Sequence, residues 1–84
     1  MIEYKVVHHV PGRIRLHVPI IRKLSVSTLR KLSTLPVPEG VKDISANPIT
    51  GSLVITYDPQ HVDIMKYVKA MVTNEEVLTT IGTG

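Results

Sequence analysis

The chain has 84 residues, is 43% hydrophobic, carries a formal net charge of +3 and contains no cysteine. This length and composition predict a single domain over residues 1–84, with an aliphatic core over about residues 4–81, and they exclude a disulfide framework and every thiolate metal site. No signal peptide and no stretch of roughly 20 apolar residues is evident, so we expect no direct membrane insertion and a cytoplasmic location.

The N-terminal region predicts extended structure. Residues 4–10 are rich in β-branched side chains, and residues 13–18 alternate polar and apolar side chains with a period of two. The alternation sorts the side chains onto two faces: Ile14, Leu16 and Val18 toward a core, and Arg13, Arg15 and His17 on the opposite face. Pro11–Gly12 between them is either a turn or a bulge in one long bent strand, and we favour the bent strand.

The middle of the chain predicts a helix and a hairpin. Leucines recur at helical spacing over residues 24–35, with Ser25 or Ser27 as the N-cap, and Pro36 ends the helix. Residues 41–46 and 52–57 then predict two antiparallel strands, because a turn-rich segment, residues 47–51, lies between them.

The C-terminal third predicts a second helix and a last strand. Asp58 followed by Pro59 favours a helix start, and the helix should run to about residue 72 with a partly buried His61 beside its apolar face. Residues 77–81 predict a short final strand. The resulting α+β order, βαββαβ, is ferredoxin-like: a four-stranded antiparallel sheet with two helices on one face and the other face open.

Two segments carry a family resemblance: HHVPGRIRLHVP at residues 8–19 and NPITGSLVITYDP at residues 47–59. In this order, and over about residues 4–81, the chain resembles the cysteine-less branch of the heavy-metal-associated (HMA-like) domain superfamily. Such domains occur alone or attached to P-type cation-transporting ATPases and other membrane proteins. The resemblance implies the fold and an association with transition-metal or iron handling. It does not bring the CxxC pair of the better-known branch, which binds copper(I) or zinc.

The chain is also similar to small iron-related members of this branch that bind haem through histidine, but the resemblance does not tell which histidine serves. Without thiolates, imidazole is the softest ligand present, and it suits a divalent transition metal or an axial position on haem. The candidate metal ligands are His8, His9 and His17. His8 and His9 point to opposite faces of a strand, so they cannot easily share one ion.

A mononuclear site needs more ligands than this segment offers. Three outcomes remain open: a site completed across a homodimer, a haem that needs only axial ligands, or no site. For haem, the candidate cofactor-binding residues are Arg13, Arg15 and His17, with the arginines bonding the propionates. The competing interpretation is that these residues are the polar half of an amphipathic strand.

These observations predict a small non-catalytic domain for metal or haem handling in metal homeostasis. The alternative is a cofactor-free interaction module that dimerises, or docks on a membrane transporter such as a P-type ATPase, through the open sheet face. The seven acidic residues are scattered and no nucleophile motif is present, so we expect no enzyme. The scarcity of aromatic residues argues against specific nucleic-acid binding.

Overall fold

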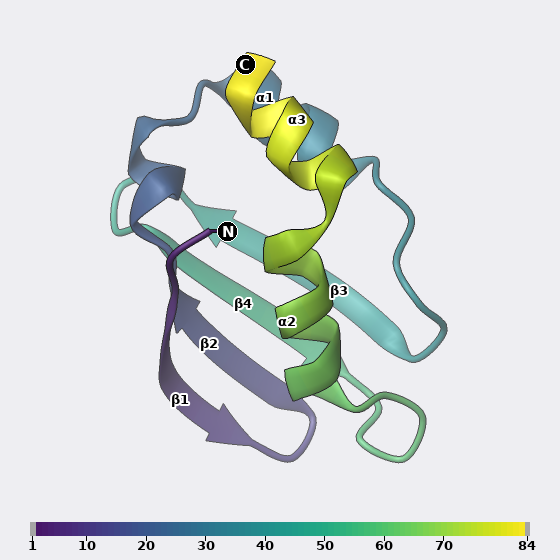
Figure 1. The fold of residues 1–84 in the computed structure, drawn as a ribbon. Helices are drawn as coiled ribbons and strands as arrows, with labels where there is room; N and C mark the ends of the chain where they lie inside the picture. Colours follow the sequence, from purple (N-terminus) through teal and green to yellow (C-terminus); the bar gives the residue numbers. More distant parts are fainter. Residues whose placement is uncertain (1, 84) are drawn as a thin grey trace.

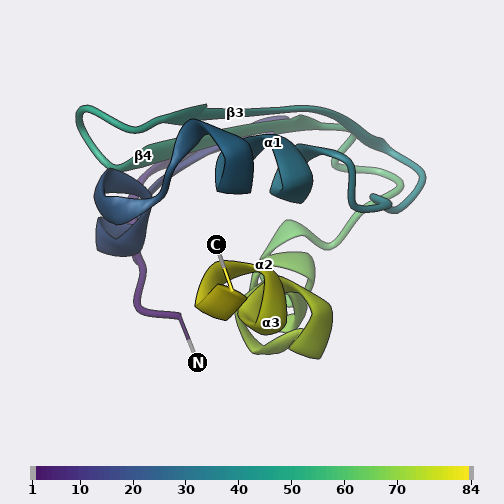
Figure 2. The same ribbon diagram turned by 90° about the horizontal axis from the view of Figure 1, so that it is seen from above.

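Four antiparallel strands form one sheet in the order β1-β2-β4-β3 in the computed structural model, which describes residues 2–83. The strands are β1 (Lys5–Val10), β2 (Arg13–His17), β3 (Val41–Asn47) and β4 (Ser52–Tyr57). The helical elements are the 3-10 helix η1 (Pro19–Lys23), α1 (Val26–Ser33), α2 (Ile64–Thr73) and α3 (Glu75–Thr83). All of them lie on one face of the sheet (Figures 1 and 2). The predicted α+β class, antiparallel sheet and one-sided helical layer are therefore confirmed.

The N-terminal segment is a hairpin and not one bent strand, so the preferred interpretation of Pro11–Gly12 was wrong. Gly12 has a φ of 89°, a conformation that glycine adopts without steric cost, and it turns the chain sharply. As a result β1 runs back antiparallel to β2, with Val10 opposite Arg13 and Lys5 opposite His17. This makes β1 an edge strand of the sheet.

The expected final strand at residues 77–81 is also wrong, because these residues belong to α3. The side-chain oxygen of Asn74 accepts hydrogen bonds from the backbone N–H groups of Glu76, at 2.8 Å, and Val77, at 3.1 Å. Such a cap, followed by two acidic residues in the first turn, favours a helix start. The fourth strand is instead supplied by β1, so the described chain has the order ββαββαα.

The caps of the two earlier helices were predicted with mixed success. Ser25 caps α1, since its hydroxyl oxygen accepts the N–H of Thr28 at 3.1 Å. The second helix begins at Ile64 with Asp63 as its cap, and not at Pro59. Asp58 caps a separate turn, in which it accepts the backbone N–H of Gln60 at 2.9 Å.

The core lies between the inner face of the sheet and the helices. The inward residues of β2, Ile14 and Leu16, are fully buried, as the alternation predicted, and Ile55 of β4 and Val68 of α2 are buried with them. Each such side chain stabilises the fold by about 1.5–3 kcal/mol relative to an exposed position. Because β2 is fixed by this inner row, its outer row is fixed as well. Within residues 2–83, no helix has the length and hydropathy that a membrane crossing requires.

Candidate functional site

The outer surface of the N-terminal hairpin collects basic side chains. Residues directly opposite each other on antiparallel strands share one face of a sheet. The register pairs Lys5 with His17, His8 with Arg15, and Val10 with Arg13, and it places the buried Ile14 and Leu16 on the opposite side. We call the outward set the basic face; its members are Lys5, His8, Arg13, Arg15 and His17.

The basic face carries little compensating charge. The next strand, β4, presents Thr56, Val54 and Ser52 beside Arg13, Arg15 and His17, respectively. Asp43 lies one strand further, on β3, opposite Thr56. In the part of the chain that the structure describes, no carboxylate forms an ion pair with the lysine or the arginines of this face. A surface of one sign attracts anions and repels a bare metal cation.

The two histidines of the basic face lie diagonally across the hairpin. His8 is exposed in the middle of β1, opposite Arg15, while His17 at the end of β2 is two residues further along. His17 is partly buried beside the turn that precedes β4. A Cβ at Gly51 would lie 3.3 Å from its Cε1 and 3.1 Å from Cγ of Arg22. The surroundings of His17 therefore restrict its ring more than those of His8 do.

His9 lies on the other side of the sheet. It is opposite Ile14, and its Nε2 is 2.9 Å from the hydroxyl of Tyr57, whose side chain is buried. His8 and His9 therefore face opposite ways, as predicted, and the sheet separates His9 from His17. Among residues 2–83, no three His, Cys, Asp or Glu side chains gather into a group that could hold a metal ion. Whether each predicted histidine binds a metal stays a prediction.

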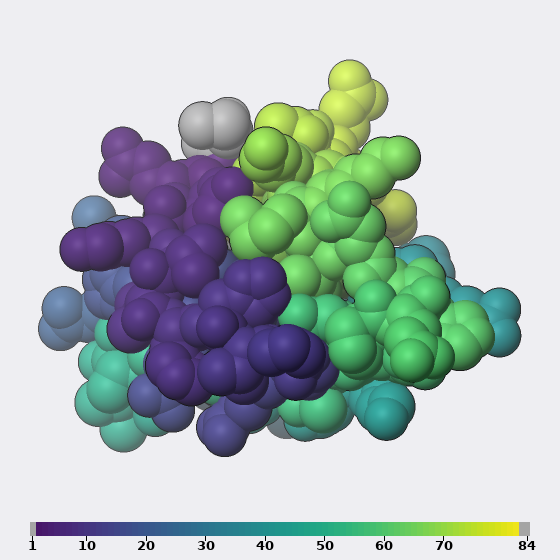
Figure 3. All heavy atoms as spheres, turned by 90° about the horizontal axis from the view of Figure 1, so that it is seen from below, coloured from purple at the N-terminus to yellow at the C-terminus, as the bar shows by residue number. Residues whose placement is uncertain are grey.

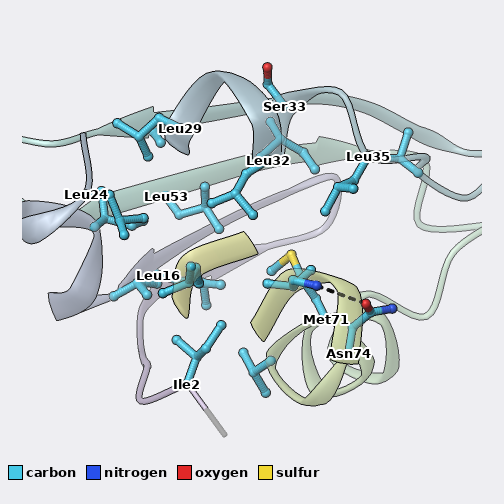
Figure 4. A pocket seen from close by; sticks show the side chains of 18 of the residues that line it. Ile2, Leu16, Leu24, Leu29, Leu32, Ser33, Leu35, Leu53, Met71 and Asn74 are labelled. Atoms are coloured by element: carbon cyan, nitrogen blue, oxygen red, sulfur yellow. Dashed lines mark hydrogen bonds between the residues drawn. The ribbon is translucent and has the colours of Figure 1, made fainter. Parts of the chain in front are cut away.

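A large cavity of about 770 Å³ lies between the inner face of the sheet and the helices. Its wall is mainly aliphatic, with Leu16 and Leu53 from the sheet, Leu32 from α1 and Met71 from α2 (Figure 4). None of the histidines and neither Arg13 nor Arg15 lines it. The apolar space and the predicted ligands are thus on opposite sides of β2.

His61 lies in an environment that the sequence did not predict. Its side chain is 61% exposed, in the loop before α2, and not partly buried on a helix face. Its Nδ1 is 2.7 Å from Oδ2 of Asp58. The hydrogen bonds from the N–H of Gln60 and from His61 lower the pKa of Asp58 below its ordinary 3.8. The sequence signal was present: an Asp two residues before Gln60 is typical of a local side-chain turn, which competes with helix initiation.

A family model described as heavy metal associated domain 2 matches residues 3–79, a range that includes every strand and both α1 and α2. No curated protein and no solved structure matches the chain.

Proposed function

The chain belongs to the heavy metal associated domain 2 family, and on this premise we propose that it is a non-catalytic metal-handling domain that takes up its metal as an anionic complex on the basic face. The observation that carries the proposal is the register of β1 on β2. It sets two imidazoles among three permanent cations on one exposed surface.

The charge of the basic face selects the form of the metal. A bare divalent cation would approach Lys5, Arg13 and Arg15 against their repulsion. A metal that arrives with carboxylate ligands is an anion and is attracted. Guanidinium groups bind carboxylates through paired, charge-assisted hydrogen bonds, and imidazole nitrogen binds zinc, copper, nickel and iron. A metal–carboxylate complex therefore matches both kinds of side chain at once.

Each residue then has a distinct role. Arg13 and Arg15 lie two positions apart on β2 and hold the carboxylates of the complex. His17 contributes an imidazole to the metal, since its ring is restricted beside Gly51, and His8 lies diagonally across as a second ligand. His9 takes no part, because its ring lies on the inner side of the sheet with Tyr57.

Haem fits only part of this surface. Haem supplies an iron that accepts axial imidazole, and its propionates match Arg13 and Arg15. Its ring, however, needs an apolar cleft, and the 770 Å³ cavity lies on the inner side of the sheet with no histidine in its wall. The residues present therefore fit a small metal–carboxylate complex, and they do not fit a haem buried in this domain alone.

Isothermal titration calorimetry with zinc citrate tests the proposal, with citrate-free zinc and haemin titrated in parallel. We expect zinc citrate to bind more tightly than free zinc, and more weakly as salt increases, because surface charges are screened. The double variant Arg13→Gln/Arg15→Gln and the variant His17→Ala should each weaken binding about tenfold or more, as losing about 1.4 kcal/mol does. The control is Arg30→Gln, on α1 and outside the basic face. Equal affinity of all variants would refute the proposal.

A second function is favoured by the exposure of β1. All six residues of this edge strand are exposed, and Val7 is 56% exposed. An edge strand offers unpaired backbone groups to another chain. This supports the alternative of a cofactor-free module that dimerises, or docks on an acidic segment of a membrane transporter or P-type ATPase. Here the metal-free domain would bind its partner with full affinity, and His17→Ala would leave that affinity unchanged.

A further inference from the structure

A second set of ligand-type side chains lies at the opposite end of the sheet, where β1 turns into β2. An open groove of about 460 Å³ is lined there by His9 of β1, Tyr57 of β4, residues 59–63 and the first turn of α2. Figure 3 shows the hairpin (purple) and α2 with the loop before it (green) side by side on this face. The groove contains none of the side chains of the basic face.

His61 is held in this groove by a carboxylate. Its Nδ1 lies 2.7 Å from Oδ2 of Asp58, and a carboxylate only accepts, so Nδ1 carries the proton. The lone pair of the neutral ring is then on Nε2. A carboxylate on one nitrogen that frees the other nitrogen for a metal is a frequent arrangement around metal-binding histidines. The second oxygen of Asp58 accepts the N–H of Gln60 at 2.9 Å, which fixes the carboxylate in turn.

The loop that carries His61 is itself anchored to the sheet. The N–H of Asp58 donates to the carbonyl oxygen of Gly40 at 2.7 Å. A Cβ at Gly40 would lie 2.9 Å from Cβ of His61, so the loop lies directly against the residue before β3. His61 is therefore exposed but held on an ordered segment, as a preorganised ligand requires.

Two further donors line the same groove. Nε2 of His9 is 2.9 Å from the hydroxyl of Tyr57, which leaves Nδ1 as its second nitrogen. Met65 brings a thioether from the first turn of α2. The groove thus combines two imidazoles with one sulfur. No third His, Cys, Asp or Glu joins a metal-binding group within residues 2–83, so a set of nitrogen and oxygen ligands for zinc is incomplete.

We propose that His9, His61 and Met65 bind a copper(I) ion across this groove, with Asp58 as the positioning residue for His61. A thioether with imidazoles selects copper(I) over harder cations, which prefer carboxylate and carbonyl oxygens. The site goes beyond the proposed function, because it uses other residues, another end of the sheet and a bare cation. The carboxylates that line or border the groove, Asp58 and Asp63, favour a cation there, in contrast to the basic face.

An anaerobic titration of the full chain with copper(I), in competition with a chromophoric chelator, tests the site. We expect His61→Ala and Met65→Leu each to weaken binding at least about tenfold, and Asp58→Asn about tenfold, the range found for second-layer partners. Met71→Leu removes a thioether that lines the inner cavity, and it should have no effect. Affinities that do not differ between the wild type and His61→Ala, or that fall equally in Met71→Leu, would overturn the proposal.

X-ray absorption gives a readout that folding alone does not move. The wild-type copper spectrum should contain a sulfur scatterer, and Met65→Leu should lose it. A spectrum with nitrogen and oxygen only would refute the site. The test is separate from that of the proposed function, because Arg13→Gln/Arg15→Gln should leave copper(I) affinity unchanged while it weakens zinc citrate. A parallel loss of both affinities in that variant would contradict an independent site.

Discussion

Gly40→Ala should be the most damaging glycine substitution near the His61 loop. Gly40 has a φ of +98°, and an added Cβ would lie 2.5 Å from Cγ2 of Val62 and 2.9 Å from Cβ of His61. The left-handed conformation costs an alanine about 1–2 kcal/mol, and forcing atoms into packed space costs about 1–3 kcal/mol. We therefore expect a loss of about 2–5 kcal/mol, a large part of the 5–15 kcal/mol that stabilises a typical domain.

Urea unfolding followed by far-ultraviolet circular dichroism measures this loss, because the chain has no tryptophan to serve as a fluorescent probe. The matched control is Gly82→Ala in α3, where an added Cβ meets nothing within 4 Å. Replacing a glycine inside a helix should stabilise by about 0.5–1 kcal/mol. If Gly40→Ala unfolds within about 0.5 kcal/mol of the wild type, the close approach of the His61 loop to the sheet is refuted.

Three further predictions test other parts of the structure. Asn74→Ala removes the cap of α3 and should cost about 1 kcal/mol in urea unfolding, and an unchanged midpoint would argue against that cap. Val41→Ile adds one methylene into the inner cavity and should stabilise by about 0.8 kcal/mol, whereas destabilisation would show that the space is already filled. Burial raises the pKa of Tyr67 above its ordinary 10.0, so the unfolded chain ionises first and stability should fall as pH rises beyond 10. Tyr67→Phe should lose less stability over that range, and identical pH profiles would contradict the burial.

Local patterns predicted the parts of the fold that depend on local chemistry. The alternation of β2 assigned Ile14 and Leu16 to the core and Arg13, Arg15 and His17 to the outer face, and the structure has them there. The hairpin of β3 and β4 followed from the turn-rich segment between them. Both patterns rest on side-chain alternation and turn residues, which act over a few positions only.

The errors occurred where two local interpretations compete and a distant contact decides. Asp58 and Asp63 are both good helix caps, and the bond from Asp58 to the Gly40 carbonyl belongs to a part of the chain that the local pattern does not include. Residues 77–81 contain β-branched side chains, but the Asn74 cap and the occupation of the neighbouring edge by β1 favour a helix.

The candidate sites depended on one of these errors. The diagonal arrangement of His8 and His17 requires the hairpin, so the bent-strand interpretation could not give their relation to Arg15 and Lys5. The groove joins His9 to Tyr57 across 48 positions and brings in His61, which a helix starting at Pro59 would have placed elsewhere. Contacts of this range arise from the tertiary fold, and periodicity carries no record of them.

The central claim is that metal reaches the basic face as an anionic complex. The most direct measurement is a map of backbone and imidazole chemical shifts during a titration with zinc citrate. The account predicts saturable shifts concentrated on β1 and β2, including Arg15 and His17, that disappear in Arg13→Gln/Arg15→Gln. Shifts centred on other elements, or shifts that the double variant keeps, would contradict it.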